Sequence, residues 1–162
     1  MIPSVIKCRG GLKLHRRTTF VKAVNYAAEI TGLQKDPGIL QIILLDQGNM
    51  AELNQAHLNH AGPTDVLTFD LRNENSAFGD IQDQDEFVAA EIYVCPEVAA
   101  RYAKEHGLDP STELLLYVVH GMLHLMGFDD HSEQDAAKMR QAEARTMEKI
   151  KARFNTTGFI KP

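Results

Sequence analysis

A mostly apolar segment that carries two histidines constrains the fold of this chain more than any other feature. It begins at Asp109-Pro110, an N-cap residue followed by a proline suited to the first helical position, and continues to about Met126. An α-helix here places His120 and His124 on one face, because residues four apart have Cβ atoms about 5–6 Å from each other. Unpaired imidazoles are costly to bury among apolar side chains, so the pair predicts a shared partner.

A metal ion is the partner that this spacing favours. Two imidazole nitrogens on one helix face can each reach a zinc ion at about 2.0–2.1 Å. Gly127 follows His124 by three residues, where a glycine can adopt the left-handed conformation that ends a helix and lets the chain double back. Such a turn can present a third ligand. Three protein ligands leave a position open for water, as in catalytic zinc sites.

The segment after Gly127 contains two candidates for the third ligand. His131 offers a neutral nitrogen that suits zinc, and Asp130, one residue nearer, offers a carboxylate. We expect His131 to complete a site for one zinc ion per chain, with Asp130 as the alternative ligand. Asp129 is then expected to orient an imidazole or the metal-bound water, so both aspartates are catalytic candidates.

The residue after the first histidine bears on the reaction. Metallopeptidases of the H-E-x-x-H type have a glutamate general base there, where this chain has Gly121. Without that base, peptide hydrolysis by the same mechanism is badly handicapped. A phosphodiester needs less help, because zinc brings the pKa of its bound water near neutrality and polarises a phosphoryl oxygen. The pattern therefore favours a phosphodiesterase over a peptidase.

The other segments read as short strands and helices. Strands are predicted near residues 5–6 and over 39–45, 66–69 and 90–95. Helices are predicted over 16–31, around 50–57, over 96–107 and from 132 to about 150, the last with Glu143 on its mostly apolar side. A surface loop is predicted over 72–87. Three or four strands among five helices predict one α+β domain over residues 1–162.

Composition excludes a membrane protein and a disulfide scaffold. No apolar run approaches the roughly 18–20 residues of a membrane span. The N-terminus has its apolar residues before its charges, the wrong order for a secretory signal, so a cytoplasmic protein is expected. Cys8 and Cys95 are too few for a cysteine-rich zinc site or a disulfide framework, and we expect both to be reduced.

Charge is unevenly spread along a chain whose formal net charge is −5. No acidic residue precedes Glu29, and Arg16 and Arg17 in this basic part are candidate RNA phosphate contacts. The alternative is a solvated helix face. The C-terminal residues Lys149, Lys151 and Arg153 are further candidate phosphate contacts.

Several sequence blocks resemble the YbeY family of bacterial endoribonucleases and rRNA maturation factors. Residues 120–131, HGMLHLMGFDDH, are similar to the family signature H-G-x-L-H-L-x-G-Y-D-H. Leu53-Asn54 followed by PTDVLTF at 63–69 is similar to the family block L-N…P-T-[ND]-V-L-S-F, and AEIYV at 90–94 stands where members have G-[DE]-I-x-[IV]. Order and spacing agree from about residue 40 to 150, most of the chain.

The resemblance implies an α+β fold in which the zinc helix packs against a small mixed sheet. It implies zinc ligation by His120, His124 and His131, and single-strand-specific RNA cleavage by zinc-activated water or through the RNA's own 2′-hydroxyl. It also implies a role in maturation of the 16S rRNA 3′ end and in ribosome quality control. The partners are then rRNA and the small ribosomal subunit, with no membrane and no nucleotide cofactor.

The chain departs from the family pattern in two places. The third histidine of the signature follows a single aspartate, whereas Asp129 and Asp130 both precede His131 here. Many members carry an arginine four residues after the L-N pair, where this chain has Leu58. His60 is a candidate replacement for RNA binding, and an ordinary surface histidine is the alternative.

Two other functions stay open from the sequence. One is a zinc metallopeptidase-like hydrolase, and the other is a non-catalytic ribosome-associated module in which zinc only holds the fold. Replacing His120 separates them, because a catalytic site loses activity and keeps most of its stability, whereas a structural site loses its fold. The metal also stays open, since nickel or iron can occupy a three-histidine site.

Overall fold

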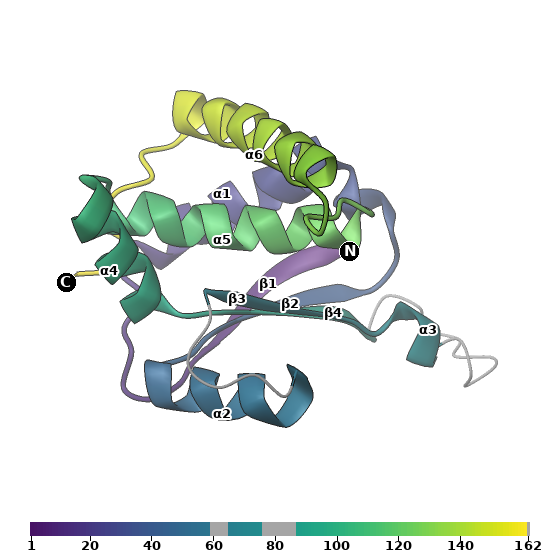
Figure 1. Cartoon of the computed structure of the whole chain (residues 1–162), viewed down its shortest axis with the longest axis horizontal. Helices are drawn as coiled ribbons and strands as arrows, with labels where there is room; N and C mark the ends of the chain where they lie inside the picture. Colours follow the sequence, from purple (N-terminus) through teal and green to yellow (C-terminus); the bar gives the residue numbers. More distant parts are fainter. Residues whose placement is uncertain (59–64, 76–86, 162) are drawn as a thin grey trace.

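The chain folds into a four-stranded mixed sheet with helices on both faces (Figure 1). The computed structural model describes residues 1–58, 65–75 and 87–161. The strands are β1 (Ile2–Cys8), β2 (Ile39–Leu44), β3 (Val66–Asp70) and β4 (Val88–Val94). The helices are α1 (Arg17–Thr31), the 3₁₀ turn η1 (Leu33–Lys35), α2 (Gln47–Leu58), α3 (Arg72–Asn75), α4 (Pro96–His106), α5 (Pro110–Leu125) and α6 (Glu133–Arg153). The predicted α+β class with a small mixed sheet is confirmed.

The order of strands in the sheet is β1-β2-β4-β3. β1, β2 and β4 run parallel, and β3 pairs antiparallel with β4. The strand predicted near residues 5–6 is longer than expected, since its pairing with β2 runs from Ile2↔Ile39 to Cys8↔Leu44. Among the described strands, this order leaves β3 at an edge of the sheet, paired on one side only.

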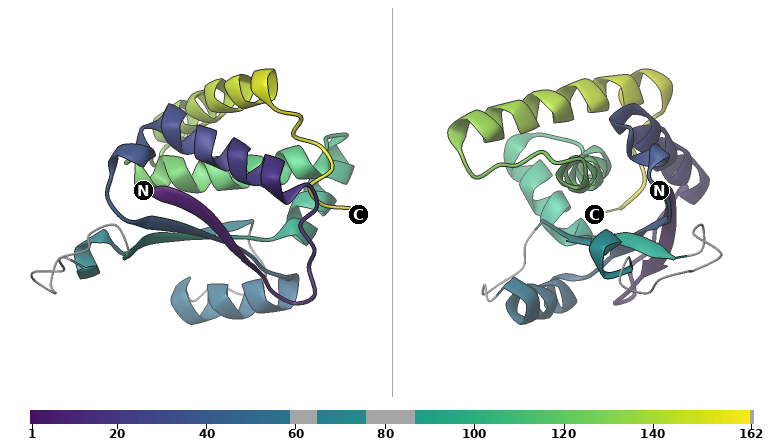
Figure 2. Two further views of the ribbon diagram at one scale, coloured as in Figure 1. Left: turned by 180° about the vertical axis from the view of Figure 1, so that it is seen from behind. Right: turned by 90° about the vertical axis from the view of Figure 1, so that its right-hand side faces the viewer.

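Helix α5 packs across one face of the sheet, with α1 and α6 on the same side, whereas α2 lies against the other face (Figures 1 and 2). The fully buried side chains of α5 include Leu114, Val118 and Met122, so this helix is part of the core. Although α5 is apolar, neither it nor any other helix within the described residues has the combination of length and hydropathy that a membrane span requires.

The ends of the last two long helices are fixed by the residues predicted to cap them. A side-chain oxygen of Asp109 accepts the backbone N–H of Thr112 at 2.9 Å, and Ser132 accepts that of Asp135 at 3.0 Å. Gly127 has φ +94°, the left-handed conformation expected after α5. The chain therefore turns sharply beyond His124 before α6 begins.

The segment after α6 returns to the start of α5 and closes the core. The buried Ser111 hydroxyl accepts the backbone N–H groups of Phe159 (2.9 Å) and Ile160 (3.0 Å). The Phe159 ring packs edge-on against Phe20 of α1, with the ring centroids 5.1 Å apart. These contacts attach the C-terminal segment to two helices.

The predicted loop over 72–87 begins with the one-turn helix α3, and residues 76–86 lie outside the described part of the chain. The Arg72 guanidinium pairs with Asp70 at 2.6 Å and with Asp36 at 2.8 Å, and it donates to the carbonyl of Leu125 at 2.7 Å. Arg72 thus links the end of β3 to the last residue of α5.

Candidate metal centre

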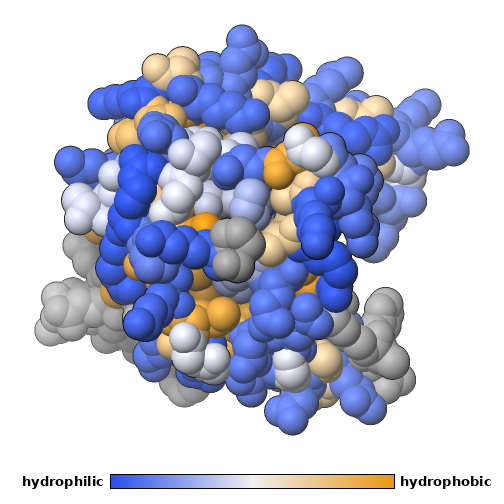
Figure 3. Space-filling view, turned by 90° about the vertical axis from the view of Figure 1, so that its left-hand side faces the viewer, coloured by the Kyte–Doolittle hydropathy of each residue, from blue (hydrophilic) through white to orange (hydrophobic). Residues whose placement is uncertain are grey.

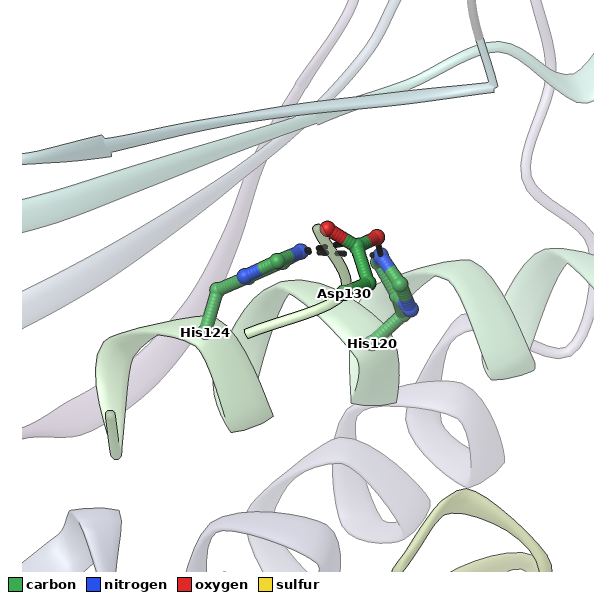
Figure 4. Close-up of side chains that lie close together, drawn as sticks. All are labelled: His120, His124 and Asp130. Atoms are coloured by element: carbon green, nitrogen blue, oxygen red, sulfur yellow. Dashed lines mark hydrogen bonds and ion pairs between the residues drawn. The ribbon is translucent and has the colours of Figure 1, made fainter. Parts of the chain in front are cut away.

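The two histidines of α5 and one aspartate from the following turn point toward a common point (Figure 4). The Nε2 atoms of His120 and His124 are 3.0 Å apart. The Oδ2 atom of Asp130 is 3.5 Å from Nε2 of His120 and 3.7 Å from Nε2 of His124. The cluster therefore presents two nitrogen donors and one carboxylate oxygen.

The other ring nitrogen of each histidine has a hydrogen-bond acceptor. The Nδ1–H group of His120 donates to Oε1 of Glu143 on α6 at 2.5 Å, and that of His124 donates to the carbonyl of Phe128 at 3.0 Å. In these tautomers both Nε2 atoms carry a lone pair and face each other. Two acceptors at that separation repel unless a cation lies between them. Either a proton on one Nε2 atom or a metal ion removes this repulsion, and the donor set fits a metal ion.

The spacing of the donors also fits zinc. Two ligands of a tetrahedral ion at about 2.0–2.1 Å are roughly 3.3 Å apart, close to the 3.0 Å observed between the two Nε2 atoms. Two imidazoles and a carboxylate are a set that catalytic zinc accepts, with a further position left for water. The set equally suits other divalent transition metals.

Electrostatics favour a positive charge at His120. Burial lowers the pKa of its imidazole, but the hydrogen bond and charge of Glu143, together with the charges of Asp130 and Asp65, outweigh burial and raise the pKa above its ordinary value. The same carboxylates that stabilise a proton here stabilise a bound cation.

His131 lies outside this cluster. Its side chain is 89% exposed, and its Nε2 atom lies 3.4 Å from Oδ1 of Asp129. Asp129, Asp130 and His131 also bring donor atoms within 4.8 Å of one another, but all three residues are exposed. His131 as a metal ligand stays a prediction, while the half-buried histidine pair gathers Asp130 instead.

Counting from Gly127 explains this placement. The family signature has its third histidine three residues after the glycine, and the residue three after Gly127 is Asp130. The extra aspartate therefore occupies the position of the histidine, and His131 is one residue beyond it. The Asp130 backbone N–H donates to Oδ1 of Asp129 at 2.7 Å, a local bond that shapes the turn.

Gly121 lies where α5 meets the sheet. A Cβ atom at this position would be 2.9 Å from Cδ1 of Ile92 and from Oγ1 of Thr68. Side chains of β3 and β4 thus fill the space that the general base of an H-E-x-x-H peptidase would need. A glutamate cannot fit there without moving the sheet away from the helix.

The cluster lies in an acidic cleft of about 570 Å³ between α5, β3 and the turn after α5. Its described lining includes Asp65, Asp70, Asp129 and Asp130, and no lysine or arginine. An acidic cleft attracts divalent cations and repels a nucleic-acid backbone. A phosphodiester in this cleft therefore needs the charge of a bound metal.

Arg16 and Arg17, two of the predicted RNA contacts, are not among the residues that line the cleft. Arg16 donates to the backbone carbonyls of Asn155 and Thr157, so its guanidinium holds the C-terminal segment. Arg17 is exposed at the first residue of α1. His60 lies outside the described residues. All three stay predictions as RNA contacts.

Glu143 is the residue whose part in the site the sequence did not predict. The helical pattern placed it on the mostly apolar side of the last helix, without a partner. A carboxylate on an otherwise buried stripe signals a buried partner, because an unpaired charge there is costly. Its partner is His120, 23 residues earlier in the sequence.

Known proteins resemble this chain in sequence. A family model described as Endoribonuclease YbeY matches residues 12–151. A protein named Endoribonuclease YbeY from Protochlamydia amoebophila is 39% identical over 113 residues, 69% of this chain and 70% of the relative. One of the same name from Desulfitobacterium hafniense is 34% identical over 142 residues, 88% and 87% of the two chains.

The fold has a counterpart among solved structures. The solution structure of TM1509 from Thermotoga maritima superposes with a TM-score of 0.61 at 26% identity, covering 93% of this chain and 89% of that one. The similarity in sequence thus extends to the whole arrangement of helices and strands. With a family model that matches residues 12–151 and relatives that are 39% and 34% identical over the aligned residues, the chain belongs to the YbeY family.

Proposed function

We propose that this protein is a metal-dependent endoribonuclease that cleaves single-stranded RNA. One divalent ion, zinc in the first instance, is held by His120, His124 and Asp130 with water in the remaining position. The proposal takes Asp130 as the third ligand in preference to His131, because only Asp130 reaches both histidines. The name of the relatives, Endoribonuclease YbeY, supports RNA as the substrate class.

One observation carries the proposal: the two Nε2 lone pairs face each other across 3.0 Å, with a carboxylate beside them. Each imidazole is fixed by a hydrogen bond on its far side, so the protein itself orients both nitrogen donors. Such second contacts set the tautomer and raise the basicity of a ligand. A preorganised donor set of this kind is what a catalytic metal site requires.

Residues in and next to the cleft have different roles in this proposal. A divalent ion bound here supplies an activated water and polarises a phosphoryl oxygen of the substrate. Glu143 and the Phe128 carbonyl orient the two imidazoles, and Asp129 holds the turn that presents Asp130. Gly121 lets α5 approach Thr68 of β3 and Ile92 of β4 closely, and β3 forms one side of the cleft.

The biological role proposed here follows from the family. Membership of the family implies a part in maturation of the 16S rRNA 3′ end and in ribosome quality control. We therefore propose rRNA on the small ribosomal subunit as the physiological substrate, and the cytoplasm as its location. A peptidase is the weaker alternative, because packing at Gly121 excludes a glutamate base from that position.

Metal content tests the ligand set. Purified wild type should hold about one zinc per chain, Asp130→Ala should lose it, and His131→Ala should keep it. Loss only in His131→Ala would assign the third ligand to His131. Asp130→His, which restores the signature at its own position, should keep the metal. No metal in wild type, even after zinc is supplied, would overturn the hydrolase proposal.

Cleavage assays test the reaction. A labelled single-stranded RNA should be cut by the zinc-loaded wild type, whereas the matching duplex and an unstructured peptide should not. His120→Ala should abolish cleavage while the variant stays folded by circular dichroism. If His120→Ala unfolds, the metal is structural, and the result supports a non-catalytic module in which zinc only holds the fold.

A further inference from the structure

A second hollow lies at the opposite end of α5 from the histidines. This groove, of about 960 Å³, runs between α4, the segment after β1 and the C-terminal segment. Figure 3 views this end of the molecule and shows apolar side chains gathered in a hollow and surrounded by hydrophilic ones. Pro110, at the first turn of α5, lines the groove, while the metal ligands lie near the last turn.

The floor of the groove is apolar and rigid. It includes Leu12, Leu108 and Ile160. Leu108 is 51% exposed, although the backbone holds it firmly: its N–H donates to the carbonyl of Ala103 at 2.8 Å. Ile160 is fixed through Ser111. Leu108 thus adds an exposed apolar side chain beside the half-buried Leu12 and the buried Ile160, and an apolar patch surrounded by polar residues is typical of a protein-binding site.

The rim of the groove is basic. Lys13, Arg101, Lys104 and Lys161 line it. Within the described parts of the chain, none of these four side chains forms a salt bridge. The one acidic residue of the lining, Glu97, accepts the backbone N–H of Gln47. The groove is therefore a positive patch on a chain whose net charge is −5.

From these features we infer that the groove binds an acidic amphipathic helix of a partner protein. Aliphatic side chains of that helix pack on the floor, and its carboxylates meet the basic rim. A helix is favoured over a strand because the lining offers no open sheet edge, so a bound peptide must satisfy its own backbone. RNA is the less suitable occupant, because the described lining offers His15 and Arg101 for base stacking but no tyrosine, phenylalanine or tryptophan.

The inference goes beyond the proposed endoribonuclease activity. The groove and the acidic cleft share no lining residue, so an occupied groove leaves the metal site open. A partner bound there brings the enzyme to its substrate or places it on an assembly, without entering the reaction. The proposed nuclease activity and the proposed docking surface can therefore be tested separately.

The test uses a synthetic peptide as the probe. The peptide is a helix of roughly four turns with leucines at i, i+3 and i+4 spacing and glutamates on its flanks. The full-length, metal-loaded protein should bind it, with backbone amide shifts confined to the groove lining. A peptide with lysines in place of the glutamates should bind at least about tenfold more weakly.

Matched charge reversals complete the experiment. The double variant Arg101→Glu with Lys104→Glu should bind the acidic peptide at least about tenfold more weakly than the wild type. The control is Lys138→Glu with Arg145→Glu, an equal charge change on the exposed face of α6, and its affinity for the peptide should stay within about twofold of the wild type. Both double variants should keep their metal and their RNA cleavage. Absence of binding up to about 0.5 mM, equal binding of the lysine peptide, or stronger shifts of the same amides by single-stranded RNA would overturn the inference.

Discussion

Glu143 of α6 accepts the Nδ1–H group of His120 of α5 at 2.5 Å, so one histidine of the candidate metal centre is held by the neighbouring helix and not by its own. This contact joins the packing of α6 on α5 to the orientation of a ligand. The position of α6 in the fold thereby acts on the chemistry of the cleft, although the helix itself does not line that cleft.

Removing the Glu143 carboxylate should weaken metal binding. Glu143→Ala leaves the His120 ring free to rotate and to change tautomer, so we expect zinc affinity to fall about 10–100-fold. Glu143→Gln keeps a hydrogen-bond acceptor without the charge, so its zinc affinity should fall less than that of Glu143→Ala. Competition with a chromophoric chelator measures both, and Glu148→Gln, an exposed site on the same helix, is the control. An unchanged affinity in Glu143→Ala would show that packing alone orients the ring.

Adding one methyl group at Gly121 should destabilise the fold. The new Cβ would meet Ile92 and Thr68 at 2.9 Å, and overpacking of this kind costs about 1–3 kcal/mol of unfolding free energy. Urea unfolding of Gly121→Ala measures it. Gly48→Ala, whose Cβ would find only Asp46 at 3.9 Å, should unfold like the wild type. Equal stability of both variants would mean that the sheet can move away from α5 at little cost.

Ser111→Ala should release the C-terminal segment. The serine hydroxyl accepts two backbone N–H groups that are otherwise buried without a partner, so its loss should cost about 2–4 kcal/mol. Hydrogen exchange should locate the effect at Phe159 and Ile160, whose amides become exposed first. Protection at these two amides equal to that of the wild type would contradict the role given to Ser111.

The buried carboxyl of Glu113 should make stability fall with rising pH. Desolvation raises its pKa, against the hydrogen bond from Tyr117, and the charges of Asp65 and Glu143 raise it further. The folded state therefore retains this proton after the unfolded state has lost it, and the penalty develops as the pH rises from the ordinary value of 4.5 through the folded pKa.

Glu113→Gln checks this sign. The variant lacks the ionisation and keeps an acceptor for Tyr117, so its advantage over the wild type should grow from near zero at pH 4 to its full size at neutral pH. Thermal unfolding across this range, with the exposed Glu105→Gln as control, gives the comparison. A difference that shrinks as the pH rises would contradict the assignment.

Local chemistry made much of the fold predictable. Asp109 with Pro110, Gly32 and Ser132 each mark a helix end where the structure has one, because caps and left-handed glycines act over a few residues. The apolar run of β2 was equally clear. β1 was underestimated, since its length depends on pairing with a strand more than 30 residues away.

The site was predictable only as far as one helix reaches. The His120 and His124 pair follows from helical geometry, whereas the third donor depends on the path of a turn that spacing alone leaves open. Arg16 shows the same limit: its guanidinium binds carbonyls 139 and 141 residues later, and no local pattern announces such a contact. Long-range contacts decided what sequence periodicity could not.

The location of Asp130 has a consequence for the donor set. Its side chain is 41% exposed on a turn, while the two histidines belong to a helix that fills the core. A substitution at position 130 changes the charge and hardness of the donor set without disturbing a buried neighbour. With Asp130 as the proposed third ligand, one substitution on the turn after Gly127 would change the donor set for the ion, while the buried scaffold that carries the two histidines would stay the same.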